Sequence, residues 1–152
     1  RQRFDLGFDL SSISEGKDIA YAMVTLNVGG VNRDQDLTVY SSDNDGWSPG
    51  SCEAEKDLCG PTYCKEECSR LFDLGVNPEV TVHVGSAGSY SFDVTEVIRS
   101  QYLGDKYASF QFRGSEENRW SSEGENSCTV PKNWDLYDVR VSSKPSLIVI
   151  YN

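Results

Sequence analysis

The sequence predicts an all-β fold: an antiparallel β-sandwich of the jelly-roll type with about eight strands. Two observations favour this class. Apolar and polar residues alternate with a period of two in several short segments, which is typical of strands with one buried face. Clusters of Gly, Ser, Asn and Asp separate these segments. With 152 residues, the chain is expected to form a single domain, residues 1–152, with a cysteine-rich insertion at residues 50–75.

The first half of the chain contains three predicted strands. The earliest, residues 4–10, alternates apolar residues with Asp or Gly, and its apolar positions are Phe4, Leu6, Phe8 and Leu10. A second strand is predicted at residues 19–28, and the pair Gly29–Gly30 is expected to end it. A short third strand covers residues 37–40, before a turn-rich stretch at residues 41–50.

The second half supplies the remaining predicted strands. They lie at residues 80–84, 90–95, 108–112, 139–141 and 147–151. A single helical turn is expected within residues 95–101. Residues 147–151 are apolar on both sides of the strand, which predicts a closing strand buried on both faces.

Five cysteines form the most unusual feature of the composition: Cys52, Cys59, Cys64, Cys68 and Cys128. Four of them cluster in an acidic, turn-rich segment, which predicts disulfides and therefore an oxidising, secreted or cell-surface location. Structural zinc sites use paired C-x₂-C knuckles, and the gaps here differ, so disulfides are favoured over metal. Because the number is odd, at least one thiol is free or pairs with another chain.

The insertion is expected to contain a short helix. Thr62 can cap it, residues 62–72 form it, and Gly75 can end it. Cys64 and Cys68 lie one helical turn apart on the same face, so each is expected to bond a cysteine packed beneath the helix. The insertion is therefore interpreted as a stapled addition to the sandwich.

The charge balance excludes several classes of partner. The formal net charge is −10 and the isoelectric point is near 4.5. Nucleic-acid binding needs basic patches, and adsorption to anionic lipid needs positive charge, so neither is expected. No stretch of about 18 apolar residues occurs, so no membrane insertion is predicted.

Calcium is the one cofactor that the acidic residues suggest. Asp43 and Asp45, followed by Gly46, resemble the start of a calcium loop, in which alternate oxygens bind a hard cation. The bidentate Glu at the twelfth position of such a loop is missing, so a solvated turn is the alternative. No other cofactor is expected.

No sequence motif indicates catalysis. His83 is the single histidine, and it alternates with valines, so it is expected to face solvent or a cross-strand neighbour. A catalytic histidine needs a nucleophile and an orienting partner, and no motif supplies them. A lyase or glycosidase is therefore disfavoured, and the chain is predicted not to be an enzyme.

Three tryptophans lie in loop-like contexts and are candidates for glycan binding: Trp47, Trp120 and Trp134. Exposed aromatic rings can stack on sugar rings while polar neighbours bind the hydroxyl groups. The alternative is that each ring plugs one end of the sandwich. The polar surroundings of Trp120 make it the strongest of these candidates. Attached glycans are a further option, since Asn126-Ser127-Cys128 is the rare cysteine variant of the N-linked acceptor.

Several segments resemble the DNRLRE-type domain, also called carbohydrate-binding module family 96. They are FDLSSI at residues 8–13, AYAMVTLNV at 20–28, LTVYSSDNDGW at 37–47, SFDVTEVIRS at 91–100 and KPSLIVIY at 144–151. This resemblance implies an extracellular, non-catalytic jelly roll, often appended to polysaccharide enzymes or surface proteins.

Two departures from that family bear on function. The insertion at residues 52–68 replaces the family's Trp-Asn-Pro stretch. The amino end is also short, because the family has about one or two more strands before the segment that begins at Phe8. A sandwich that lacks a strand exposes unpaired backbone groups, which a strand from a neighbouring copy can fill. Residues 4–10 are the predicted assembly strand.

Two functions follow from these observations. The first is a structural subunit that assembles head-to-tail into an extracellular fibre or surface layer, because a head-to-tail contact propagates instead of closing. The alternative is a carbohydrate-binding module that recognises a polysaccharide through its loop aromatics.

Overall fold

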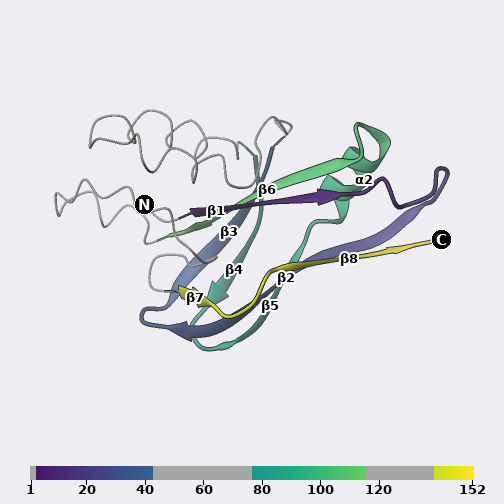
Figure 1. Cartoon of the computed structure of the whole chain (residues 1–152). Coiled ribbons are helices and arrows are strands. Elements are labelled where there is room, and N and C mark those ends of the chain that lie inside the picture. The colour runs from purple at the N-terminus through teal and green to yellow at the C-terminus, as the bar shows by residue number, and fades with distance from the viewer. Residues whose placement is uncertain (1–2, 43–76, 116–138) are drawn as a thin grey trace, which may run out of the picture.

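Two antiparallel β-sheets packed face to face make up the structure, a computed structural model that describes residues 3–42, 77–115 and 139–152 (Figure 1). Within those ranges there are eight strands and one short helix. The predicted all-β antiparallel sandwich is therefore confirmed.

Sheet A has the strand order β1-β6-β3-β4. Its strands are β1 (Arg3–Asp9), β3 (Gln35–Ser42), β4 (Asn77–Val84) and β6 (Tyr107–Gly114). Every neighbouring pair is antiparallel. β1 and β4 are the two edges of this sheet.

Sheet B is built around one long strand. Its strands are β2 (Ile19–Val31), β5 (Gly88–Asp93), β7 (Val139–Val141) and β8 (Ser146–Tyr151). β5 pairs with one side of β2, and β8 and β7 pair one after the other along its opposite side. β5 and β8 are therefore both edge strands.

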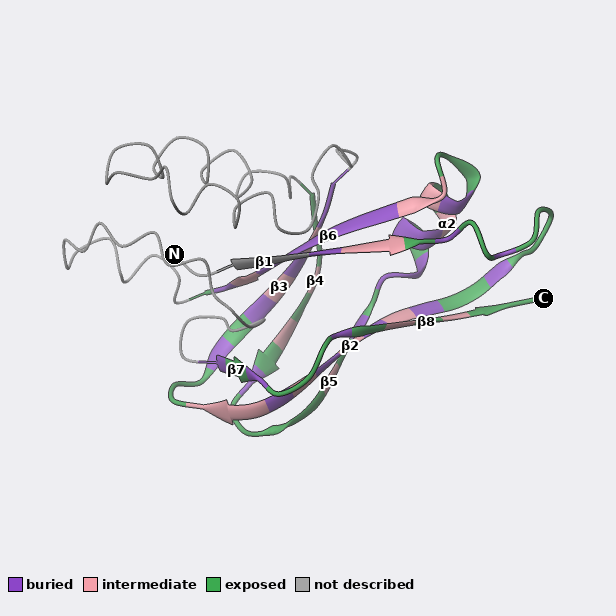
Figure 2. Ribbon diagram, viewed as in Figure 1, coloured by how far each residue is buried: buried purple, intermediate pink, exposed green. Residues whose placement is uncertain are grey.

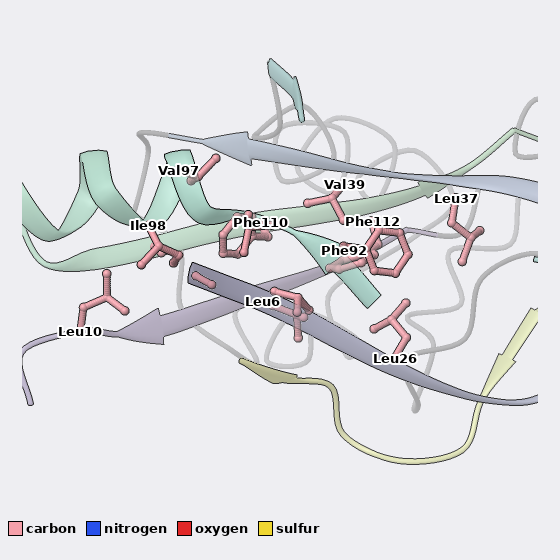
Figure 3. Packing of buried hydrophobic residues seen from close by; sticks show 14 of the residues in the cluster. Leu6, Leu10, Leu26, Leu37, Val39, Phe92, Val97, Ile98, Phe110 and Phe112 are labelled. Atoms are coloured by element: carbon pink, nitrogen blue, oxygen red, sulfur yellow. The ribbon is translucent and has the colours of Figure 1, made fainter. Parts of the chain in front are cut away.

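The hydrophobic core lies between the two sheets and consists of side chains from both of them. Along each strand, alternate apolar side chains point inward (Figure 3). Phe92 of sheet B and Phe112 of sheet A meet edge to face, with ring centroids 5.2 Å apart at an interplanar angle of 89°. Contacts of this kind join the two sheets into one packed unit.

The helix α2 (Thr95–Leu103) packs against β2 and β6, one strand from each sheet, and covers one end of the sandwich (Figure 1). Val97, Ile98 and Tyr102 are its buried apolar side chains. Helical periodicity in this segment predicts only a single turn, whereas the structure has nine helical residues. Burial against both sheets stabilises the longer helix.

Several predicted strand boundaries are wrong, and three of the differences have a clear physical cause. β2 continues through Gly29 and Gly30, because pairing with β7 carries the strand past the glycines with a register shift. β3 extends to Ser42, into the stretch predicted as turns, because it pairs with strands on both sides. β5 ends at Asp93, where the chain turns into the helix.

The closing strand is also not buried on both faces as predicted. Ile148 and Ile150 of β8 are 49% and 54% exposed. The reason is position: β8 is an edge strand of sheet B, so only its inner face, with Leu147 and Val149, packs against the core. Figure 2 shows β8 as exposed or intermediate along its whole length.

Candidate functional site

Most of the residues that the sequence singles out lie outside the described part of the chain. These are Cys52, Cys59, Cys64, Cys68, Cys128, Trp47, Trp120, Trp134, Asp43 and Asp45. The predicted insertion and its helix, within residues 50–75, lie there too. The disulfide, glycan and calcium assignments therefore stay predictions.

The predicted assembly strand is β1, and it lies at the edge of sheet A, paired with β6. Leu6 is buried, and so is Leu10, directly after the strand; Phe8 is half-buried and meets Phe110 edge to face. Donating β1 to another copy would remove these side chains from their own core. If β1 takes part in assembly, accepting a strand would leave these side chains in place, whereas donation would not.

His83 makes a cross-strand contact on the exposed face of sheet A. Its Nδ1 lies 2.9 Å from Oδ1 of Asp36, the residue opposite it on β3. The next pair on the same face joins the hydroxyl groups of Thr38 and Thr81, 2.8 Å apart. The expectation that His83 faces solvent or a cross-strand neighbour is confirmed.

Residues 3–42, 77–115 and 139–152 contain no cluster of three or more His, Cys, Asp or Glu side chains that could hold a metal ion. The helix in these ranges lacks the length and apolar character needed to cross a membrane.

A small apolar surface lies on the outer face of sheet B, where β2 and β8 pair. We call it the outer patch, and it consists of Tyr21, Met23, Ile148 and Ile150. The register places Tyr21 opposite Ile150 and Met23 opposite Ile148, so the four side chains point to the same side of the sheet. Tyr21 is 38% exposed, and its hydroxyl group lies 3.6 Å from the Met23 sulfur.

The edge next to the outer patch lacks the usual protection against strand addition. Exposed edges are commonly blunted by charged side chains or proline. β1 has three charged residues, β4 includes Pro78 and Glu79, and β5 ends in Asp93. The six residues of β8, SLIVIY, include no charge, proline or glycine. Among the described strands β8 pairs only with β2, so one side of this segment is left unpaired by the described residues.

Around Asn27, hydroxyl and amide groups cover the outer face of sheet B, and the exposed charged residues Asp93 and Arg140 lie elsewhere on it. Asn27 is at the centre: its side-chain Oδ1 accepts a hydrogen bond from Ser89 at 2.6 Å, and its Nδ2 donates to Ser143 at 3.0 Å. Thr25 and Ser91, opposite each other, have hydroxyl oxygens 3.5 Å apart. This part of the face is polar but uncharged.

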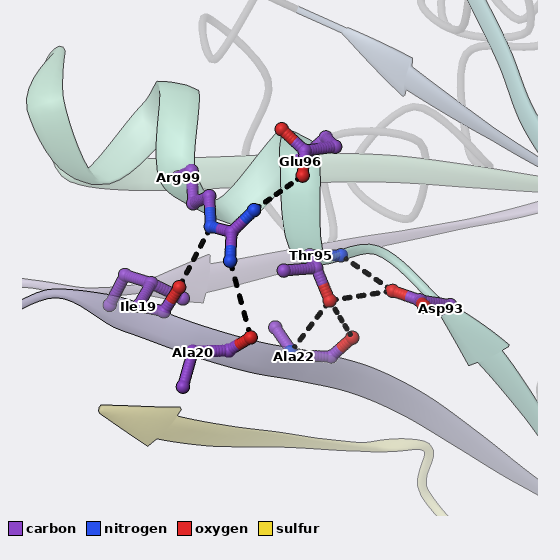
Figure 4. A network of polar contacts seen from close by, with 7 residues as sticks. All are labelled: Ile19, Ala20, Ala22, Asp93, Thr95, Glu96 and Arg99. Atoms are coloured by element: carbon purple, nitrogen blue, oxygen red, sulfur yellow. Dashed lines mark hydrogen bonds and ion pairs between the residues drawn. The ribbon is translucent and has the colours of Figure 1, made fainter. Parts of the chain in front are cut away.

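Helix α2 holds the part of β2 that carries Tyr21 (Figure 4). Arg99 donates hydrogen bonds to the carbonyl oxygens of Ile19 at 2.7 Å and Ala20 at 3.2 Å, and also pairs with Glu96. These bonds fix the backbone directly before Tyr21. The outer patch therefore sits on a braced segment of strand.

A second set of bonds fixes the backbone directly after Tyr21. The Thr95 hydroxyl group accepts a hydrogen bond from the N–H of Ala22 at 3.0 Å and donates to the Asp93 carboxylate at 2.6 Å. The side-chain and backbone hydrogen bonds from Thr95 hold the pKa of Asp93 below its ordinary value. The helix and β5 thus both contribute to the position of the outer patch.

The sequence predicts a strand at residues 147–151, but it does not predict that one face of this strand is exposed. A strand that is apolar on both sides looks the same in sequence whether it is central or at an edge. The nearest signal is the absence of any charge or proline between Ser146 and Tyr151.

In comparisons with known proteins, no family model and no curated protein matches this sequence. The resemblance to carbohydrate-binding module family 96 stays a prediction.

Proposed function

We propose that this chain is a non-catalytic, extracellular structural module that associates with further copies of itself by strand addition at its sheet edges. Assembly into a head-to-tail fibre or a surface layer is the expected product, with β1 as the assembly strand that the sequence predicts. The observation that carries the proposal is the uncharged edge of β8, left unpaired by the described residues, beside the outer patch.

Strand addition follows from the physical properties of that edge. An edge strand presents a row of backbone donors and acceptors that another strand can satisfy. At β8, the same contact would also bury Ile148 and Ile150, both about half exposed in the single chain. Removing apolar surface from water adds free energy to the backbone hydrogen bonds.

The test is the association state of the whole chain. Sedimentation equilibrium over a range of concentrations is expected to show concentration-dependent association, and negative-stain microscopy is expected to show long assemblies. A chain that stays monomeric at the highest concentrations, with no assemblies in the images, would overturn the proposal.

The substitution Ile150→Lys tests whether β8 carries the contact. A charge at the centre of a strand interface must be desolvated, so association is expected to weaken by about tenfold or more. The control is Ser86→Lys, which makes the same change of charge in the exposed turn between β4 and β5. Equal association of the two variants would exclude β8.

A carbohydrate-binding module is the second candidate. The uncharged hydroxyl and amide groups around Asn27 support it, because such groups bind sugar hydroxyls. Affinity electrophoresis through gels that contain polysaccharides is expected to retard the chain on at least one of them. Loss of that retardation in Trp120→Ala would identify the loop aromatic, and migration unchanged by every polysaccharide would reject this function.

A further inference from the structure

We infer that β8 pairs with β8 of a second copy, antiparallel and about a two-fold axis, which joins the two B sheets into one continuous sheet. This inference rests on the proposed function and deepens it, because it names the partner edge and the symmetry of the contact.

Charge is the first argument for a second copy at this edge. The chain has a formal net charge of −10, so most approaches between two copies bring like charges together. β8 has no charged residue, and the outer patch beside it has none. Two acidic copies can therefore meet along β8 without placing like charges opposite each other.

The side-chain pattern of β8 is the second argument, because it is complementary to itself. In an antiparallel pair centred on Val149, Ile148 of each copy lies opposite Ile150 of the other copy. Directly opposite residues point to the same face of a sheet. The isoleucines therefore pack against isoleucines on the outer face, and Val149 packs against its own counterpart on the inner face.

The opposite edge of sheet B, strand β5, matches β8 less well than a second β8 does. β5 presents Ser89 and Ser91 on the face where β8 presents isoleucine. β5 and β8 are both antiparallel to β2, so they run parallel to each other. Stacking copies by translation would pair β8 with β5 in parallel, in a sheet whose described pairs are all antiparallel, and parallel pairing is slightly weaker.

A two-fold contact has a consequence for assembly. It uses the same surface on both copies and closes on itself, so it makes a dimer and does not propagate. A fibre built from this module then requires a second contact, for which β1 at the edge of sheet A is available. The repeating unit would be a dimer joined at β8.

The experiment combines two variants with opposite charges, Ile148→Lys and Ile150→Glu. In the two-fold pair these positions lie directly opposite each other, so a mixed dimer gains one ion pair and keeps one isoleucine pair. Sedimentation equilibrium is expected to show each variant alone weakened by about tenfold or more, and the equimolar mixture restored to near the unmodified chain.

Two controls exclude simpler explanations. Mixing Ile148→Lys with Ile148→Glu brings together the same charges but places each of them opposite an isoleucine in the two-fold pair, and should restore association less. Circular dichroism and thermal unfolding of each variant check the fold, which is expected to be retained because both isoleucines are about half exposed.

The outcomes separate this inference from the proposed function. If the unmodified chain is monomeric, the proposed function fails. If it associates, but Ser89→Lys on β5 weakens it and the mixture of β8 variants does not recover, then β8 pairs with β5 head to tail. That result would overturn the two-fold contact and leave self-association standing.

Discussion

Gly7 of β1 shows how closely one residue can be constrained by its neighbour. A Cβ atom placed on Gly7 would stand 2.0 Å from the hydroxyl oxygen of Tyr107, on the strand beside it. No such approach is possible between real atoms, so the Tyr107 ring occupies space that a larger residue would need. Glycine in a strand often marks a close approach of this kind.

Gly7→Ala is therefore expected to displace the Tyr107 ring and to destabilise the chain by roughly 1–2 kcal/mol. The matched control is Gly88→Ala in β5, where a Cβ would meet Tyr90 at an ordinary 3.8 Å. Urea denaturation measures both free energies of unfolding. Equal values for the two variants would contradict the close packing of Tyr107.

At the scale of elements, the hydrogen bonds between α2 and β2 fix the segment of β2 that carries the outer patch. Thr95 opens the helix, and its side chain binds β2 at Ala22 and β5 at Asp93. One hydroxyl group thus connects three elements. A segment with the pattern DVTEVIRS is short and weakly helical, and packing of α2 against both sheets supplies the rest of its stability.

Replacing Thr95 by Val keeps the shape but removes the hydroxyl group. Buried groups left without their partners cost about 1–3 kcal/mol, so Thr95→Val is expected to lower the free energy of unfolding by that amount. The half-buried Thr25 on the outer face of β2 provides the control, Thr25→Val, since its hydroxyl group makes only a 3.5 Å contact with Ser91 across the surface. A Thr95 variant as stable as the Thr25 variant would disprove the bracing role.

At the scale of the whole molecule, the free energy of unfolding is expected to depend on the ionisation of Asp93 at low pH. The Thr95 hydrogen bonds lower the pKa of Asp93 in the folded chain relative to its ordinary value of 3.8. The carboxylate therefore stabilises the fold at pH values above 3.8, and this contribution is lost as the pH falls through the lower folded pKa.

Asp93→Asn tests this dependence. The difference in unfolding free energy between the original chain and the variant should be constant at neutral pH and should shrink as the pH falls below about 4. Urea denaturation at a series of pH values measures it. A difference that grows on acidification would reverse the assigned direction of the pKa shift.

Also at the scale of the molecule, the position of each strand within its sheet could not be predicted. Residues 4–10 alternate apolar residues with Asp or Gly, whereas residues 147–151 are all apolar, yet the pairing places both strands at sheet edges. The continuation of β2 through Gly29 and Gly30 could not be predicted either. It depends on pairing with β7, which lies more than 100 residues later in the sequence. Contacts so far apart in sequence leave no local pattern.

The amino-acid sequence by itself determined the class of fold. Period-two alternation separated by turn residues specifies strands with one buried face, and that property is local. The tertiary structure alone decided which strands are edges and which side chains meet across them. The candidate site depends on that second kind of information: Ile148 and Ile150 form a surface with Tyr21 because β8 pairs with β2 and with no other described strand.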